Sequence, residues 1–337
     1  MIKDAIAKTL RRENLTQAEA EAAMLDIMTG NATQAQIGAY LIALRMKGET
    51  VAEITGSARA MRANAVPVPV NRDSTLYDTA GTGGDGKRTF NISTAAAFVI
   101  AGAGRKVAKH GNRAASSQCG SADVLDALGV NLDLTPEEVG RAIDEVGIGF
   151  LFAPKFHPAM KHAVGPRKEI GQRTIFNVLG PLTNPAGAEV QIIGVFDPEL
   201  TETMAQVLGE LGSRAAYVVH GCGGMDELNT VGPNRVSHLK DGKVTSMTLD
   251  PEMLQLPRGD MAELTGGAPE DNAKILRGVL GGSLNGTCKN AVLLNAAAAL
   301  AAESGDWQAG LASARKSLES GAALQKLDEL VEFSARV

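Results

Sequence analysis

Two glycine-rich polar runs lie close together in the sequence and contain the residues best suited to hold an anion. They are residues 81–85 (GTGGD) and 109–113 (KHGNR), with residues 91–94 (NIST) between them. Glycines lack Cβ, so they let the backbone turn sharply and point N–H groups at an anion from close range. Lys109 and Arg113 add positive charge to the same region. The pattern indicates a pocket for a phosphorylated ligand.

The first glycine run follows a predicted strand, and a helix is expected to begin near Ser93 or Thr94. Free N–H groups at that helix N-terminus, together with the helix dipole, would favour phosphate. The run has neither the Gly-Lys-Ser/Thr of a P-loop nor the Gly-x-Gly-x-x-Gly spacing, which argues against a nucleoside triphosphatase. It also lacks the acidic pair and Thr-Gly-Gly-Thr loop of the commoner phosphoribosyltransferases, so a phosphoribosyl group would be handled on another fold.

Two adjacent carboxylates, Asp226 and Glu227, follow a predicted strand that ends at His220 and a glycine-rich turn over 221–224. Exposed acidic pairs usually serve only solvation. Here the pair lies beyond the carboxyl end of a predicted parallel strand, where α/β sheets bind ligands. Two oxygen donors beside a phosphorylated ligand suit Mg²⁺, so a metal site is favoured over a solvated surface pair.

Residues 166–168 and 173–185 are punctuated by proline and glycine and are rich in amides and cations, which indicates a structured loop. Arg167 can hold a carboxylate through two hydrogen bonds, and its alternative is an ordinary surface charge. The five histidines show no metal-ligand spacing and no Ser–His–acid arrangement, so covalent catalysis is not indicated. His110 is a candidate substrate contact, whereas His157 and His162 are expected on a helix surface or at the core edge.

Composition limits the other possibilities. The chain has 337 residues, 44% apolar and 21% charged, and can bury a full core. A net charge of −5 and 4% aromatic residues provide neither a broad basic face nor stacking rings for nucleic acid. The N-terminus lacks the plan of a secretion signal, and the longest apolar run, 291–302, is interrupted by Asn295 and shorter than the ~20 residues that span a membrane. A cytoplasmic protein without membrane contact is expected, and that run should form a buried helix.

Cys119, Cys222 and Cys288 are odd in number and far apart, which argues against a disulfide framework and a structural zinc site. Cys119 lies inside the glycine-rich region without a partnered base. The favoured interpretation is a small residue lining a loop.

The first 65 or so residues predict a compact helical unit. Three capping boxes follow one another: Thr16 with Glu19, Thr33 with Gln36, and Thr50 with Glu53. Gly30 and Gly48 stand where helices would end on a left-handed residue. Antiparallel helices joined by short turns are therefore expected.

From Leu76 onward the pattern changes to short β-rich runs that alternate with helices. The runs are 77–79, 106–108, 148–152, 191–195 and 216–219. This alternation predicts a mainly parallel central sheet covered by helices. Thr135 and Glu138 form a further capping box, residues 236–247 predict a β-hairpin around Asp241-Gly242, and the C-terminal end returns to helix.

Taken in order, residues 81–85, 91–94, 109–117, 173–185 and 226–227 resemble the motifs of the anthranilate phosphoribosyltransferase family of tryptophan biosynthesis. The resemblance extends over essentially the whole chain. It implies transfer of phosphoribosyl from 5-phosphoribosyl 1-diphosphate to the amine of anthranilate, with Mg²⁺ as cofactor and with N-(5-phosphoribosyl)anthranilate and diphosphate as products.

The resemblance also implies the nucleoside phosphorylase/phosphoribosyltransferase-type fold. That fold has a small all-helical domain over residues 1–70, on which an inserted segment around 165–185 packs. A large α/β domain over residues 71–337 binds the phosphoribosyl diphosphate, and the active site lies between the two domains. A homodimer formed through the helical domain is expected.

Site residues carry over from the family motifs as follows. The phosphoribosyl diphosphate site would comprise Gly81, Gly84, Asp85, Thr89, Asn91, Ile92, Ser93, Thr94, Lys109, His110, Gly111, Asn112, Arg113, Ala114, Ala115, Ser116, Ser117 and Ser121. The metal would be held by Ser93, Asp226 and Glu227. Anthranilate would lie against Gly81, Asn112, Arg167 and His110, with Arg167 pairing with its carboxylate.

The implied chemistry develops positive charge at the ribose C1 as diphosphate leaves, so it needs leaving-group neutralisation more than a nucleophile. The residues expected to carry it are Lys109, Asp226, Glu227 and Arg167. Gln118-Cys119 departs from the small polar residues common in relatives.

Two alternatives share this fold class. A pyrimidine nucleoside phosphorylase also cleaves at the ribose C1, but its family carries Lys-His-Ser where this chain has Lys109-His110-Gly111. A catalytically silent nucleic-acid-binding relative is disfavoured by the net negative charge and by the intact acidic pair.

Overall fold

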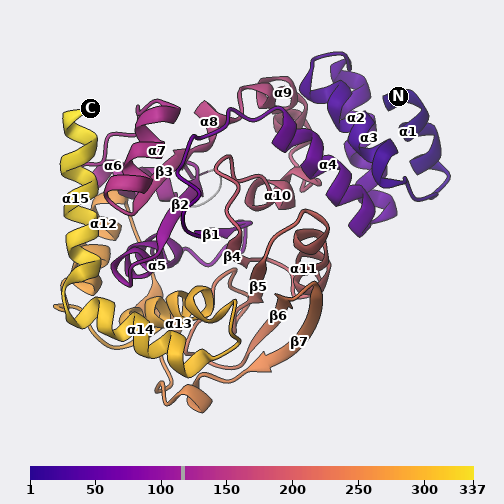
Figure 1. The fold of residues 1–337 in the computed structure, drawn as a ribbon. Helices are drawn as coiled ribbons and strands as arrows, with labels where there is room; N and C mark the ends of the chain where they lie inside the picture. Colours follow the sequence, from indigo (N-terminus) through magenta and orange to yellow (C-terminus); the bar gives the residue numbers. More distant parts are fainter. Residues whose placement is uncertain (115–117) are drawn as a thin grey trace.

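A computed structural model describes residues 1–114 and 118–337 of the chain. Ala115, Ser116 and Ser117, assigned by resemblance to the phosphoribosyl diphosphate site, lie outside the described residues. The structure consists of a helical unit joined to one side of a larger α/β body (Figure 1).

The helical unit is built from capped amphipathic helices. Residues 1–70, all of them described, form four helices: α1 (Ile2–Leu10), α2 (Gln17–Met28), α3 (Gln34–Lys47) and α4 (Val51–Ala63). The capping boxes predicted at Thr16, Thr33 and Thr50 open α2, α3 and α4. Gly48 ends α3 with φ +91°, and Gly30 follows α2 with φ +78°, so both predicted stops are confirmed.

A single mixed sheet forms the centre of the α/β body. The described residues contribute seven strands: β1 (Leu76–Gly81), β2 (Lys106–Gly111), β3 (Ile148–Phe152), β4 (Val190–Gly194), β5 (Ala215–His220), β6 (Asn234–Lys240) and β7 (Lys243–Leu249). Their order is β3-β2-β1-β4-β5-β6-β7, and the first five are parallel. The antiparallel β6 and β7 form the predicted hairpin around Asp241-Gly242. The chain order reverses direction between β1 and β4, which is the point where such sheets bind ligands.

Helices cover both faces of the sheet. Those outside the helical unit are α5 (Ile92–Gly102), α6 (Ser121–Ala127), α7 (Pro136–Glu145), α8 (Ala153–Phe156), α9 (Lys161–Ile170), α10 (Phe176–Leu179), α11 (Leu200–Glu210), α12 (Pro269–Leu280), α13 (Thr287–Ala301), α14 (Trp307–Glu319) and α15 (Ala322–Arg336). Short 3₁₀ turns occupy Pro158–Met160, Gly180–Leu182, Pro251–Leu254 and Met261–Leu264. The capping box at Thr135 opens α7 as predicted.

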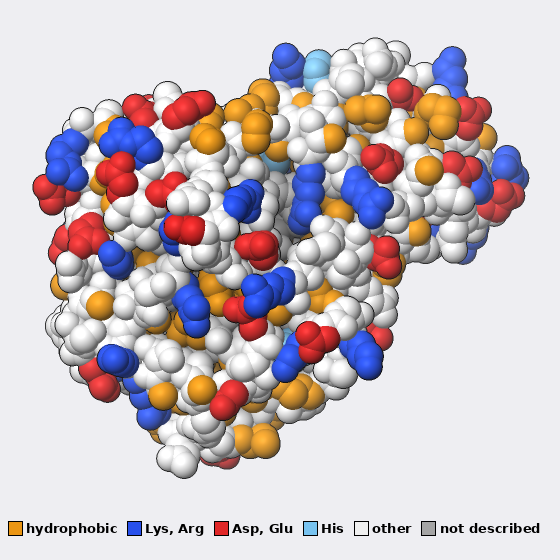
Figure 2. Space-filling model, viewed as in Figure 1, with side chains coloured by type: hydrophobic (Ala, Val, Ile, Leu, Met, Phe, Trp, Pro, Cys, Tyr) orange, Lys and Arg blue, Asp and Glu red, His pale blue; other side chains and the backbone are white. Residues whose placement is uncertain are grey.

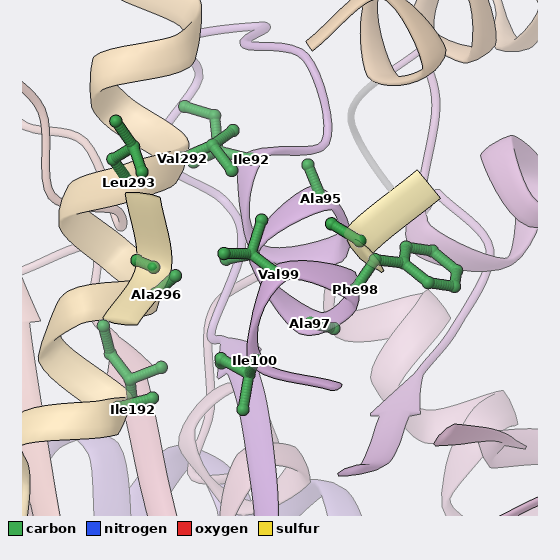
Figure 3. Close-up of a cluster of buried hydrophobic side chains, with 14 of the residues drawn as sticks. Ile92, Ala95, Ala97, Phe98, Val99, Ile100, Ile192, Val292, Leu293 and Ala296 are labelled. Carbon is green, nitrogen blue, oxygen red and sulfur yellow. The ribbon is translucent and has the colours of Figure 1, made fainter. Parts of the chain in front are cut away.

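The core of the α/β body lies where α5 packs against α13. Figure 3 shows Val99 and Ile100 of α5 facing Val292 and Ala296 of α13, beside Ile192 of the sheet. The buried helix predicted over 291–302 is thus present, because residues 291–301 form the larger, C-terminal part of α13. Among the described residues, no helix has both the length and the apolar character needed to cross a membrane.

The segment between β3 and β4 returns toward the helical unit. Helix α9 packs on α3 and α2, and α10 packs on α4. Ala163, Phe176 and Leu179 share one core with Leu41 and Leu44 of α3. This packing supports an inserted segment around 165–185, while the domain limits at 1–70 and 71–337 stay predictions.

Candidate active site

A cleft of about 710 Å³ opens at the carboxyl ends of the parallel strands and extends to α8, α9 and α10. Figure 2 shows the surface hollowed between the α/β body and the helical unit, with Lys and Arg side chains beside the hollow. The predicted site residues that line it are Gly81, Gly84, Asp85, Thr89, Asn91, Ser93, Lys109, His110, Gly111, Asn112, Arg113, Ala114, Ser121, Arg167, Asp226 and Glu227. Residues far apart along the chain therefore meet in one cleft.

Ile92 and Thr94 do not line this cleft. Both side chains are fully buried, with Ile92 in the core beneath α5. Only their backbone atoms can face a ligand, so the side chains of these two predicted site residues take no part in lining the cleft.

The glycine loop after β1 turns through left-handed backbone. Gly83, Gly84 and Gly86 have φ values of +64°, +76° and +73°, which residues with a Cβ rarely adopt. The Gly83 N–H donates to Asp226 Oδ2 at 2.7 Å. On the other side, the Arg173 guanidinium donates to the Gly84 carbonyl and lies 4.1 Å from the centroid of the Phe196 ring. The loop is therefore held from two sides.

The N-terminus of α5 already faces a carboxylate of the protein. The Ser93 N–H donates to Glu227 Oε1 at 3.0 Å. The sequence predicted free N–H groups here for a phosphate, and for Ser93 that prediction is wrong. An acidic side chain at this position satisfies an N–H that the helix leaves unpaired and interacts favourably with the helix dipole.

Asp226 and Glu227 are partly buried in the cleft and have perturbed acidities. Desolvation, with Asp85 beside it, raises the pKa of Asp226 to about 7. Desolvation and the Asp226 charge raise the pKa of Glu227 to about 8. Burial and mutual repulsion disfavour the ionised form of both carboxylates, and a bound cation would stabilise that ionised form.

A divalent cation fits these residues only with added oxygen donors. No group of three or more His, Cys, Asp or Glu side chains among the described residues is arranged to hold a metal. Mg²⁺ takes few protein ligands and completes its shell with water and phosphate oxygens. The Asp226–Glu227 pair with the nearby Ser93 hydroxyl is such an incomplete donor set.

The two cations of the second glycine run, Lys109 and Arg113, are less available to an anionic ligand than the sequence indicated. Lys109 is 3% exposed, and its Nζ donates to the Thr79 carbonyl at 2.6 Å. Desolvation lowers the pKa of Lys109 to about 8, although Asp78 and Glu227 favour its charge. Lys109 thus lines the cleft as an almost fully buried side chain whose ammonium is bonded to Thr79.

Arg113 lies at the cleft edge with its charge already paired. Its guanidinium donates to Asp123 at 2.9 Å and to Asp126 at 3.0 Å, both on α6. The sequence treated this charge as free for a phosphate, and the structure corrects that view.

At the opposite end of the cleft, Arg167 of α9 stacks over Phe176 of α10, 5.1 Å from the ring centroid. Burial lowers the pKa of Arg167, and no acidic side chain in the described part of the chain lies within ion-pair distance. A desolvated guanidinium with an open fork favours a planar carboxylate ligand.

His110 and His157 form a neutral pair in the same part of the cleft. Each is 7% exposed, and their ring centroids lie 5.1 Å apart. Burial lowers the pKa of His110 to about 3 and that of His157 to about 4. Neither Nε2 atom has a hydrogen-bond partner within residues 1–114 and 118–337.

The sequence placed His157 at a helix surface or core edge, and this prediction was wrong. His157 follows α8, which begins directly after β3, so its position beyond a parallel strand end was a usable signal. Phe176 was named only within a loop, and its place beneath Arg167 depends on how α9 and α10 pack. His162 does lie at the edge of the helical unit, against Gly30.

Cys119 also borders the cleft, as the predicted small loop residue. Its Sγ lies 3.3 Å from Asn91 Oδ1, and desolvation raises the pKa of its thiol to about 11. All three cysteines are free, as predicted.

Comparison with known proteins identifies the family. Residues 3–65 match the helical bundle domain of a glycosyl transferase family, and residues 73–324 match the a/b domain of that family. An anthranilate phosphoribosyltransferase of Moorella thermoacetica is 56% identical over 335 residues, covering 99% of this chain and 98% of the relative. The chain belongs to the anthranilate phosphoribosyltransferase family.

Solved structures of the same family agree in fold. The anthranilate phosphoribosyltransferase of Thermus thermophilus superimposes with a TM-score of 0.93 at 47% identity, covering 98% of this chain and 99% of the other. The enzyme of Saccharomyces cerevisiae, solved in complex with PRPP and Mg, gives 0.89 at 29% identity over 100% and 98% of the two chains. The fold class and the enzyme class predicted from the sequence are thereby confirmed, and the family is favoured over both alternatives.

Proposed function

We propose that this chain transfers the phosphoribosyl group of 5-phosphoribosyl 1-diphosphate to the amine of anthranilate and releases diphosphate. The observation that carries the proposal is that one cleft has a carboxylate pair at one end and, at the other, an Arg without an acidic partner among the described residues. These two ends suit the two substrates, a metal-bound diphosphate and an aromatic carboxylate. Family membership supports the same reaction.

For the metal, we propose Ser93, Asp226 and Glu227 as ligands. Mg²⁺, when bound there, would supply neutralisation of the charge that develops on the leaving diphosphate. Lys109 would add to this from its buried position in the cleft lining, where Asp78 and Glu227 favour its charged form. The glycine loop after β1, apart from the Gly83 N–H that already donates to Asp226, would hold the phosphate oxygens.

For the acceptor, we propose that the Arg167 fork binds the anthranilate carboxylate and that Phe176 supports the guanidinium from below. His110 and His157, which also line the cleft, would lie beside the anthranilate ring. Because both imidazoles are neutral, they do not compete with Arg167 for the carboxylate.

In this arrangement the cleft works by orientation. Holding the amine within reach of the ribose C1 can contribute about 7–11 kcal/mol in well-aligned cases. The acceptor side comes from helices that pack on the helical unit, so closure of that unit would bring it toward the diphosphate side and exclude water.

The test follows the loss of anthranilate fluorescence when the protein is mixed with anthranilate, phosphoribosyl diphosphate and Mg²⁺. We expect a loss that scales with protein concentration and stops when the metal is chelated. A parallel reaction with a pyrimidine nucleoside and phosphate should show no cleavage. No fluorescence loss at any protein concentration would reject the proposed reaction.

We further propose that the protein is a cytoplasmic homodimer that associates through the helical unit. Leu10, Leu25 and Met46 of that unit are 70%, 43% and 71% exposed. Light scattering should give twice the mass of one chain, and a monomer at micromolar concentration would contradict this arrangement.

A further inference from the structure

Asn295 is a buried polar residue in an otherwise apolar stretch of α13. It is 3% exposed, and the residues around it on this helix are mostly alanine, leucine and valine. A buried amide is costly unless it is fully hydrogen-bonded. The structure shows where these bonds go.

The Asn295 amide pairs with both backbone groups of Leu228. Its Oδ1 accepts from the Leu228 N–H at 3.1 Å, and its Nδ2 donates to the Leu228 carbonyl at 2.7 Å. The same Nδ2 donates to the Ala291 carbonyl at 2.8 Å. One side chain thus binds a loop residue 67 positions away in the sequence.

Leu228 directly follows the two cleft carboxylates. Met225 and Leu228, which flank the Asp226–Glu227 pair, are fully buried in the core of the α/β body. The backbone that Asn295 binds is therefore the anchor on the C-terminal side of the pair.

Strand ends confine the same segment from the other side. Gly194 ends β4, and a Cβ there would overlap the Asp226 carbonyl. Gly221 follows β5, and a Cβ there would overlap the Glu227 carbonyl. The backbone of Asp226 and Glu227 therefore packs directly against the ends of β4 and β5, and Asn295 binds the next residue, Leu228.

We infer that Asn295 is a positioning residue for the Asp226–Glu227 carboxylates. By fixing Leu228, it keeps Glu227 Oε1 at 3.0 Å from the Ser93 N–H and Asp226 Oδ2 at 2.7 Å from the Gly83 N–H. Asn295 is not among the described residues that line the cleft, so it acts through the backbone alone. The inference rests on the proposed function, because it assigns Asn295 to the proposed Mg²⁺ site.

The test substitutes Asn295→Leu, which keeps the volume and removes all three bonds. Binding of phosphoribosyl diphosphate is measured by calorimetry at a series of Mg²⁺ concentrations, with no anthranilate present and therefore no turnover. Losing support behind metal ligands typically costs 10- to 100-fold in metal affinity, so we expect the Mg²⁺ requirement to rise roughly 10-fold. In steady-state assays the KM for anthranilate should stay within about twofold, since the acceptor end is untouched.

Ser317→Ala is the matched control. Ser317 is 2% exposed on α14 and donates to the Val99 carbonyl of α5 at 2.8 Å, so its loss also removes a buried side-chain bond from this body. Ser317 binds α5 and not the 225–228 segment. The Mg²⁺ requirement of the Ser317→Ala variant should therefore equal that of the parent protein. Thermal unfolding of each variant separates global destabilisation from the local effect.

An unchanged Mg²⁺ requirement in folded Asn295→Leu would overturn the inference while leaving the proposed function intact. If that variant does not fold, Asn295→Ser decides by the same criterion, because it removes both bonds to Leu228 without adding volume. Absence of Mg²⁺-dependent binding in the parent protein would instead reject the proposed metal site, and this inference with it.

Discussion

At the end of the cleft beside β1, β4 and β5, the groups that face a ligand are held by backbone, whereas beside α9 and α10 they are held by side-chain packing. Asp226 and Glu227 receive N–H groups from Gly83 and Ser93. Arg167 instead rests on the Phe176 ring, and both belong to the segment that packs on the helical unit.

The two ends also differ in charge balance. The acidic end concentrates carboxylates whose ionisation is suppressed, with the Lys109 ammonium beneath them. The acceptor end contains one desolvated cation and two neutral imidazoles. The acidic end thus suits a divalent cation, and the acceptor end suits a carboxylate.

The largest effect is expected from neutralising the acidic end with Asp226→Asn and Glu227→Gln together. Removing the charges takes away the proposed metal ligands, and loss of such electrostatic stabilisation typically lowers turnover on the order of 10²–10³-fold. Turnover at a series of Mg²⁺ concentrations measures this loss.

The same double variant should remain folded, because each amide replaces a carboxylate of equal size. Circular dichroism and thermal unfolding check this point. A Mg²⁺ dependence equal to that of the parent would show that these carboxylates are not metal ligands. The proposed difference between a metal-binding end and an acceptor end would then be wrong.

The second prediction concerns the acceptor end. Arg167→Ala should raise the KM for anthranilate roughly 10- to 100-fold, because a hydrogen bond to a charged group is worth about 1.5–3 kcal/mol. The KM for phosphoribosyl diphosphate should change by less than about twofold, since no group of the acidic end is altered. Steady-state kinetics with each substrate varied in turn measures both constants.

Arg141→Ala is the control for this substitution. Arg141 of α7 also lies over a phenylalanine, Phe333, at 5.5 Å, but on the surface away from the cleft. Equal changes in both KM values for Arg167→Ala would show that Arg167 supports the whole cleft and not the acceptor alone.

The contrast between the ends explains what the sequence could predict. Glycine runs, capping boxes and strand-end carboxylates are local patterns, and the elements they predicted around β1, β5 and α5 are present. Phe176 has no such local signature, because its place in the cleft depends on α9 and α10 folding back onto the helical unit. His157 had only its position after β3 as a signal.

The sequence also could not show which side chains and backbone groups would pair with each charged residue. From sequence alone Arg113 and Lys109 looked like free cations, yet Asp123 and Asp126 pair with the first and Thr79 binds the second. Likewise, Glu227 meets the Ser93 N–H from 134 positions away. Long-range pairings of this kind follow from the assembled sheet and not from spacing along the chain.

The smallest expected effect is a pH dependence of stability that belongs to the acidic end alone. In the folded protein the carboxyl pKa values are about 7 for Asp226 and about 8 for Glu227, raised from about 4 for the free side chains. The folded state therefore holds protons that the unfolded state releases, and stability must fall as pH rises through this range. With the metal chelated, we expect the unfolding temperature to drop by a few degrees between about pH 6.5 and 8.

This window separates the acidic end from the other perturbed groups. His110 and His157 have lowered pKa values, so they reduce stability only as pH falls below about 6.5. Lys109, with its pKa lowered to about 8, adds stability only as pH rises from there toward its ordinary value.

Calorimetric scans of the parent and of the Asp226→Asn, Glu227→Gln variant measure the difference. The variant should be flat across the window, and Mg²⁺ should reduce the slope of the parent, because a cation stabilises the ionised pair. A parent that is equally flat without metal would mean that both carboxylates ionise freely, and the acidic end would then lack the suppressed charge that distinguishes it from the acceptor end.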